Sequence, residues 1–264
     1  LERVGIGTKV LYPADAVPSV DPVPLIEAAL AAPSGAAPLA SQLTAATKLT
    51  VVVIDCDWPL PRPEFDVRRA MVEHVLETAA RAGVDDVQIV IANGLKQRWS
   101  PVQVTKVLGD RVASSFLPDG LVTSHDATSD DLVTVGEVDG VPVRVNRRVA
   151  ESDLVVSIGV RSDHTATCPL IVGLTDVATV NRISGVRGDA DFCQQVGELV
   201  RERLTIFSLV AVLGQALLGH NLRFVGKREW EWNLGDRLAL MAARQVVAAL
   251  PRQGARLLHG NPLA

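Results

Sequence analysis

The chain has 264 residues, of which 48% are hydrophobic and 21% charged, so it is long enough to bury a substantial core. Its formal charge of −4 excludes the strongly basic class of nucleic-acid-binding proteins. No apolar run approaches the ~20 residues that a membrane-spanning helix needs, and the N-terminus lacks a secretory signal. Three cysteines without CxxC spacing exclude a disulfide framework and a structural zinc site. We therefore expect a cytoplasmic protein that binds neither nucleic acid nor membrane.

The N-terminal region predicts one strand and one helix. Val10–Tyr12 predict an edge strand. Asp21 and Pro22 have the sequence of a helix cap and a first helical position, and the helix through Leu30 is predicted to end before Pro33.

The next segments predict a strand, a helix and a second strand in succession. Val51–Ile54 form a short β-branched run, which is typical of a strand buried on both faces of a parallel sheet. The segment from Glu64 to Ala82 carries apolar residues on one face and precedes Gly83, so it predicts an amphipathic helix. Val87–Ala92 predict the next strand, and the unit has the length of a right-handed parallel crossover.

A capped helix and a hairpin are predicted in the middle of the chain. Ser100 and Gln103 have the spacing of a capping box, with proline at the first helical position. Residues 122–131 are polar and acidic and predict a loop. Residues 132–145 alternate between apolar and polar, so they predict an antiparallel hairpin that turns at Asp139–Gly140.

The rest of the chain predicts more strands and helices. Leu154–Gly159 form the third strongly apolar strand, and a polar loop follows it. A helix is predicted from Asp189 to Leu204, strands near residues 207–213 and 222–225, and a last helix over 236–250. Together the pattern predicts a single three-layer, Rossmann-like α/β domain over the whole chain, with a mainly parallel sheet and an antiparallel hairpin insertion.

Polar residues follow the predicted strands where open α/β sheets bind ligands. Asp55 and Asp57 come directly after the first buried strand, in a turn rich in proline. These carboxylates are binding candidates, although they would also serve as caps of that turn. His125 and His164 lie in polar loops after two other apolar segments, which makes them candidates for proton transfer. The signatures GxSxG, GxxxxGK[ST], GxGxxG and HExxH are absent, so no generic catalytic motif names the chemistry.

Five segments carry a further signal through their order: IEAALAAPSGAAPLASQL, VVVIDCDWPLPRP, VQIVIANGLKQ, SHDATSDDLVTVGEVDGVPVRVNRRVAESDLVVSIG and SDH. This order resembles the N-terminal domain of the nickel-pincer lactate racemase family. The resemblance runs from about Val10 to Arg182 and more loosely to Leu250. It implies enzymes that interconvert stereoisomers of 2-hydroxy acids by hydride transfer to and from a nickel-pincer nucleotide, with two histidines as acid and base.

The resemblance assigns roles to particular residues. Asp55 and Gly94 match motif positions at the ends of the first two strands, and His164 matches one catalytic histidine. Lys96 stands where the family has the other catalytic histidine, and Arg182 stands where it has a nickel-binding histidine. Asp55, Gly94 and His164 each follow an apolar strand, so we expect them to converge at one edge of the sheet.

Other departures from the family concern the cofactor. Asp57 and Trp58 stand in place of a threonine and a substrate-binding arginine, and the glycine-rich segment with the cofactor-anchoring lysine is missing between His164 and Asn181. We therefore expect no nickel-pincer nucleotide and no metal site. The family's second α/β domain is also expected to be absent after Pro251, so a partner domain or a homo-oligomer would have to replace it.

Two functions remain open. One is an active, divergent 2-hydroxy-acid racemase or epimerase, an isomerase that uses Lys96 and His164. The other, which we favour, is a binding domain that keeps the fold without racemase activity and holds a small anion or a nucleotide. The residues predicted to bind the cofactor or anion are Asp55, Asp57, Trp58, Gly94, Arg161 and Arg182, with Arg62, Arg98 and Lys227 as further cations.

The surroundings of Lys96 separate these two functions. A lysine that acts as a base must be desolvated and must face the same cleft as its acid partner. The neighbouring residues Gln97–Ser100 are polar and lead into a capped helix. We therefore expect the Lys96 ammonium in an open basic pocket with Arg98 or Arg161, where it retains its charge.

Overall fold

The computed structural model describes residues 19, 21–55, 66–161, 169–184, 188–212 and 231–249. Internal contacts divide the chain into two compact units, one of residues 1–59 and 65–214 and the other of residues 60–64 and 215–264. All described strands lie in the first unit. The strands predicted at residues 10–12 and 222–225 lie outside the described residues.

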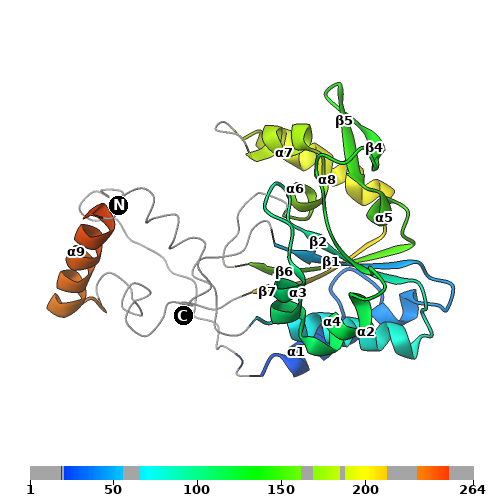
Figure 1. Cartoon of the computed structure of the whole chain (residues 1–264), viewed down its shortest axis with the longest axis horizontal. Helices are drawn as coiled ribbons and strands as arrows, with labels where there is room; N and C mark the ends of the chain where they lie inside the picture. The colour runs from blue at the N-terminus through cyan, green and yellow to red at the C-terminus, as the bar shows by residue number, and fades with distance from the viewer. Residues whose placement is uncertain are drawn as a thin grey trace. The chain divides into compact units, whose positions relative to one another are not determined.

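The first unit is built on a five-stranded sheet with the order β3-β2-β1-β6-β7 (Figure 1). Every neighbouring pair in this sheet is parallel. Because the strands are parallel, their carboxyl ends all lie along the same edge of the sheet. The strands are β1 (Leu49–Ile54), β2 (Val87–Ala92), β3 (Val122–Ser124), β6 (Leu154–Arg161) and β7 (Ile206–Val212).

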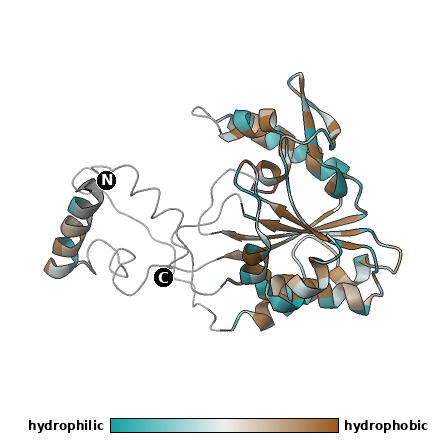
Figure 2. Cartoon of the chain, viewed as in Figure 1, coloured by the Kyte–Doolittle hydropathy of each residue, from teal (hydrophilic) through white to brown (hydrophobic). Residues whose placement is uncertain are grey.

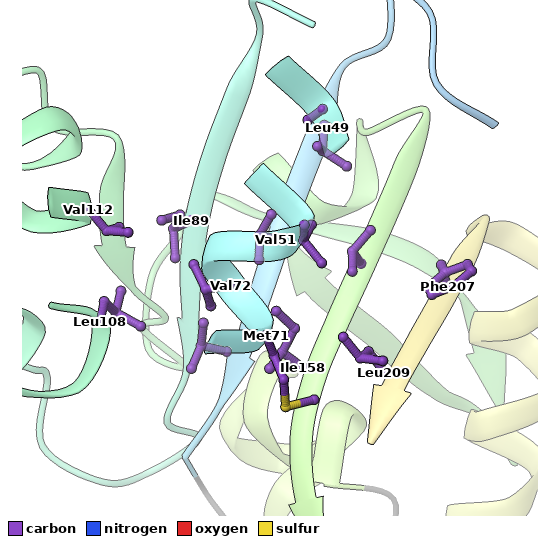
Figure 3. Close-up of a cluster of buried hydrophobic side chains, with 14 of the residues drawn as sticks. Leu49, Val51, Met71, Val72, Ile89, Leu108, Val112, Ile158, Phe207 and Leu209 are labelled. Carbon is purple, nitrogen blue, oxygen red and sulfur yellow. The ribbon is translucent and has the colours of Figure 1, made fainter. Parts of the chain in front are cut away.

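One face of the sheet is covered by the helices from the first half of the chain. Val51 and Ile89 point into this core, where they meet Met71 and Val72 of the second helix and Leu108 of the third (Figure 3). All five side chains are at most 1% exposed. This burial explains why the sequences of the strands are continuous apolar runs. The helices on this face are α1 (Val23–Ala31), α2 (Arg68–Arg81), α3 (Pro101–Leu108) and α4 (Asp110–Phe116), and the 3-10 helix η1 (Leu39–Gln42) also contributes to this core.

The opposite face carries a second core. Val52 and Val90, which alternate with the residues of the first core, pack with Phe192 and Val196 of the long helix α8 (Ala190–Arg203). Helices on both faces of a parallel sheet give three layers, so the predicted fold class is confirmed, and Figure 2 shows the hydrophobic strands between them. The other elements on this side are α5 (Arg147–Ala150), α6 (Pro169–Leu174), α7 (Val177–Ser184) and the antiparallel pair β4 (Leu132–Val138) and β5 (Val141–Asn146).

Local sequence signals determine several of these elements. The Ser100 side chain accepts from the Gln103 amide and the Gln103 side chain accepts from the Ser100 amide, so the predicted capping box begins α3. The hairpin turns at Asp139 and Gly140, whose φ angles are 50° and 74°, as its sequence predicted. The prediction of a loop over residues 122–131 was wrong at its start, because the three residues of β3 extend the sheet beside β2.

The second unit is described over residues 231–249 and contains α9 (Leu234–Ala249). This helix begins with a reciprocal cap: the Asn233 amide donates to the Asp236 carboxylate at 3.0 Å and the Asp236 amide donates to Asn233 Oδ1 at 2.8 Å. Within the described residues, no helix has both the length and the apolar character to cross a bilayer.

Candidate functional site

Polar residues gather where β1, β2 and β3 end. Asp55 directly follows β1 and its amide donates to the carbonyl of Ala92, the last residue of β2, at 3.1 Å. The His125 amide donates in the same way to Ile91 at 2.9 Å. Asp55, Gly94 and His125 therefore lie along one edge of the sheet, as the parallel order requires. Asp57, Trp58 and His164 lie outside the described residues, and so does the side chain of Arg161 at the end of β6.

The Asp55 side chain is buried and fully engaged. It is 5% exposed, and its two carboxylate oxygens have different donors. Arg68 Nη1 donates to Oδ1 at 3.3 Å, and Trp99 Nε1 donates to Oδ2 at 2.9 Å. A carboxylate held from both sides in this way has a fixed orientation.

Arg68 is the buried cation of this edge, with only 1% of its surface exposed. Its Nη2 donates to Asp66 at 2.7 Å, and its Nη1 donates to the Ile54 carbonyl at 2.8 Å. The guanidinium also lies 5.4 Å from the centre of the Trp99 ring. Burial of a charge is costly unless it is paired, and Asp55 and Asp66 both pair with this one.

The turn after β2 is held by its own hydrogen bonds. The Lys96 amide donates to the Asn93 carbonyl at 3.0 Å, and Asn93 Nδ2 donates back to the Lys96 carbonyl at 2.8 Å. Gly94 has a φ of 58°, in the left-handed region that favours glycine, and its amide donates to the Gly173 carbonyl of α6 at 3.2 Å. The backbone that carries Lys96 is therefore preorganised.

α6 contacts this turn at very close range. A Cβ atom on Gly173 would lie 2.6 Å from Ala92 Cβ and 2.8 Å from the Ala92 carbonyl oxygen. Only a glycine lets the helix backbone approach the end of β2 so closely. This contact ties the second layer to the edge that carries the polar residues.

The side chain of Lys96 is exposed, and its ammonium lies over Asp55. Lys96 Nζ donates to the Asp55 main-chain carbonyl at 2.8 Å, not to the carboxylate. Arg98, one of the two cations expected beside Lys96, forms an ion pair with Asp126. The side chain of the other, Arg161, lies outside the described residues, so the basic pocket stays a prediction. Among the described residues, no carboxylate forms an ion pair with the Lys96 ammonium.

Arg182 has a different environment from the other predicted site residues. It lies on α7, where its Nη2 contacts Asp139 at 2.7 Å and Asp189 at 3.1 Å. Its guanidinium also lies 3.8 Å from the centre of the Phe192 ring. These contacts tie the hairpin turn to α7 and α8, and none of the described contacts of Arg182 joins it to Asp55 or Lys96.

The described residues do not fit a nickel-pincer nucleotide. A guanidinium has no free lone pair for a metal, so Arg182 cannot replace a histidine ligand. Among the described residues there is no group of three His, Cys, Asp or Glu side chains that could hold a metal ion.

His125 is buried and links two segments of the chain through a hydrogen bond. It is 1% exposed, its Nε2 lies 2.9 Å from the Thr175 carbonyl, and its Nδ1 has no hydrogen-bond partner among the described residues. Burial lowers the pKa of His125, against the opposing effects of the Thr175 hydrogen bond, Asp126 and Asp176; Arg98 lowers it further. The ring is therefore neutral at pH 7 and donates through Nε2, which joins β3 to the connection between α6 and α7.

Sequence reasoning missed two of the residues that build this site. Arg68 and Trp99 were not candidates, because a single arginine in a helix is usually solvated and a single tryptophan usually fills a core. The one available signal was Asp66 at the helix start, two residues before Arg68. The Arg68 amide donates to Asp66 at 3.1 Å, and the Arg68 side chain extends to the end of β1.

The fold and the edge define a class: an α/β domain with a parallel sheet and polar residues at the carboxyl ends of its strands. Residues 6–167 match the model of the lactate racemase N-terminal domain. The chain belongs to this family. No curated protein matches it by sequence.

One solved structure gives the same picture of the fold. The lactate racemase apoprotein from Thermoanaerobacterium thermosaccharolyticum is similar with a TM-score of 0.56 and 16% identity, over 71% of this chain and 48% of that one. A protein from Thermotoga maritima is similar with a TM-score of 0.48 and 16% identity, over 64% of this chain and 47% of that one. The chain thus spans about half the length of the solved proteins that it matches.

Proposed function

We propose that this lactate racemase-like domain binds a small anion, a carboxylate or the phosphate of a nucleotide, at the carboxyl ends of β1 and β2, and that it does not racemise 2-hydroxy acids. One observation carries the proposal: Lys96 is exposed at this edge, and its ammonium contacts a neutral carbonyl 2.8 Å away. Such a cation is available to an incoming anion.

The surroundings of Lys96 support binding over proton transfer. A lysine accepts protons near neutral pH only where burial disfavours its charged form. The Lys96 side chain is exposed, and its backbone is fixed by Asn93 and Gly94. A fixed ammonium binds an anion by charge and hydrogen bonding.

The departures from the family support the loss of racemase activity. The resemblance places Lys96 at a catalytic histidine and Arg182 at a nickel ligand, and Arg182 forms ion pairs with Asp139 and Asp189. His164 and Arg161 remain candidates to complete the anion site beside Lys96. We further propose that a second domain or a second copy of the chain covers this edge.

The proposal is tested by calorimetric titration with inorganic phosphate, adenosine monophosphate and both lactate enantiomers. The variant Lys96→Met should lose about tenfold or more in affinity for the anion that binds, since a charge-assisted hydrogen bond contributes ~1.5–3 kcal/mol. The matched control is Lys106→Met, which removes an exposed lysine from the last turn of α3 and should leave binding unchanged.

Activity is measured on the same proteins by chiral separation of 2-hydroxy acids after prolonged incubation. We expect no change in stereochemistry with the parent chain. Racemisation by the parent that is abolished in Lys96→Met, without loss of folding, would identify an isomerase and overturn the proposal. Equal anion binding by Lys96→Met and the parent would overturn the assignment of Lys96.

A further inference from the structure

We propose that Arg68 and Trp99 are positioning residues that hold the Asp55 carboxylate away from Lys96 and so keep the Lys96 ammonium available to an anion. This inference rests on the proposed function and extends it to residues that do not touch the ligand. It makes the availability of the Lys96 ammonium depend on the two hydrogen bonds that Arg68 and Trp99 donate to Asp55.

The Asp55 carboxylate is a competitor of the anion for the Lys96 ammonium. Lys96 Nζ already contacts the main-chain carbonyl of Asp55 at 2.8 Å. The carboxylate of the same residue is therefore within reach of the ammonium after a rotation about the Asp55 Cα–Cβ bond. An ion pair between neighbouring groups forms at a high effective concentration, so it would compete strongly with any anion from solution.

The carboxylate does not make that ion pair because two other donors fix its orientation. Trp99 Nε1 donates to Oδ2 at 2.9 Å, and Arg68 Nη1 donates to Oδ1 at 3.3 Å. Arg68 makes its shorter contact with Asp66, at 2.7 Å. The indole of Trp99 is therefore the stronger constraint on Asp55, and Arg68 balances the buried negative charge.

The position of Trp99 is itself set by two other elements. Its amide donates to Ser124 Oγ, in the last residue of β3, at 3.0 Å. The next residue, Ser100, begins the capping box of α3. Trp99 thus holds Asp55 at the end of β1 from a backbone position fixed by β3 and α3. With Arg68 of α2, four elements therefore determine whether the Lys96 ammonium is available to an anion.

The decisive variant is Trp99→Phe, which keeps an aromatic ring and removes the Nε1 donor. The freed carboxylate should then pair with Lys96, and the affinity for the anion that binds the parent should fall by about fivefold, which corresponds to an ion pair of ~1 kcal/mol. The double variant Asp55→Asn/Trp99→Phe should restore binding to the level of the Asp55→Asn variant. A role in folding alone would not produce this rescue, so loss without rescue would overturn the proposal.

A second readout needs no ligand and separates this inference from the proposed function. An ion-paired amine reacts slowly with an acylating reagent, so Lys96 in Trp99→Phe should be modified about fivefold more slowly than in the parent, as measured by peptide mass spectrometry. Lys106 in the same protein is the internal control and should react at an unchanged rate. Equal Lys96 rates in the parent and the variant would overturn the inference even where no tested anion binds.

A variant that leaves the ring in place covers the case in which Trp99→Phe does not fold. Ser124→Ala removes the acceptor of the Trp99 amide and should loosen the indole. It should slow acylation of Lys96 in the same direction by a smaller factor, and Asp55→Asn should again reverse the effect. Faster acylation of Lys96 in Ser124→Ala would contradict the proposed competition.

Discussion

The two ends of the parallel sheet each hold a buried or largely buried arginine, but they differ in whether the neighbouring lysine forms an ion pair. At the amino ends of β1 and β2, Arg148 donates to the Leu49 carbonyl at 3.0 Å and pairs with Asp86 at 2.7 Å, while Lys48 pairs with Glu151. At the carboxyl ends, Arg68 is paired with Asp55 and Asp66 and a second cation, Lys96, contacts a carbonyl.

This difference separates a structural edge from a candidate binding edge. At the amino ends, the described lysine and arginine are each matched by a carboxylate. At the carboxyl ends, Arg68 pairs with both Asp55 and Asp66, and the exposed Lys96 forms no ion pair with a described carboxylate. The comparison teaches that the role of a cation depends on which carboxylates its neighbours have already paired with.

The largest expected effect is on stability at the carboxyl edge. Arg68→Met leaves the carboxylates of Asp55 and Asp66 without their buried partner and should lower the free energy of unfolding by about 3–5 kcal/mol. Arg148→Met, at the amino edge, should cost less, about 1–2 kcal/mol, because its carboxylate partner Asp86 is half exposed and can be hydrated. Urea denaturation of both variants measures the difference, and equal losses would remove the distinction between the two edges.

The next effect concerns the contact between α6 and the end of β2. Gly173→Ala would place a methyl group 2.6 Å from Ala92 Cβ and should lower the free energy of unfolding by about 1–3 kcal/mol. The matched control is Gly197→Ala in α8, where the nearest atom, Ile171 Cδ1, is 3.4 Å from the added Cβ. This control should be neutral or stabilising, because alanine favours a helix over glycine. A control as unstable as Gly173→Ala would rule out close approach as the cause.

The smallest effect is a dependence of stability on pH. Burial lowers the pKa of His125, so the unfolded chain binds its proton at higher pH than the folded chain does. The contribution of neutral His125 is complete above the unfolded value of about 6.5 and is lost as the pH falls below it toward the folded pKa, by at most ~1.4 kcal/mol per pH unit. The His125→Gln variant should lack this slope when unfolding free energies are measured from pH 7.5 to pH 5.5. An unchanged slope would assign it to other groups.

The sequence predicted most of the sheet, because its strands are continuous apolar runs whose faces are both buried. Val51–Ile54 and Val87–Ala92 are examples, and the latter range agrees with the bounds of β2. β3, α6 and α7 were not predicted, since each has eight residues or fewer and gives only a short pattern. Their form depends on tertiary contacts, such as the pairing of β3 with Ile89–Ile91.

The candidate site was predicted only in part. Asp55 and Gly94 were placed at the correct edge, because strand order alone brings them there. The contacts of Lys96 could not be predicted, since they depend on where Arg68, at the start of α2, and Trp99, before α3, direct their side chains. Charge pairing between distant residues leaves no periodic trace in a sequence.

The most direct test of the account is a map of where an anion binds. Amide chemical shifts of the labelled chain, recorded during titration with inorganic phosphate, compare residues 93–96 at the carboxyl edge with residues 48–50 at the amino edge. The account predicts saturable shifts at residues 93–96 that disappear in Lys96→Met and persist in Lys106→Met. Shifts centred on residues 48–50, or shifts at residues 93–96 that survive in Lys96→Met, would contradict it.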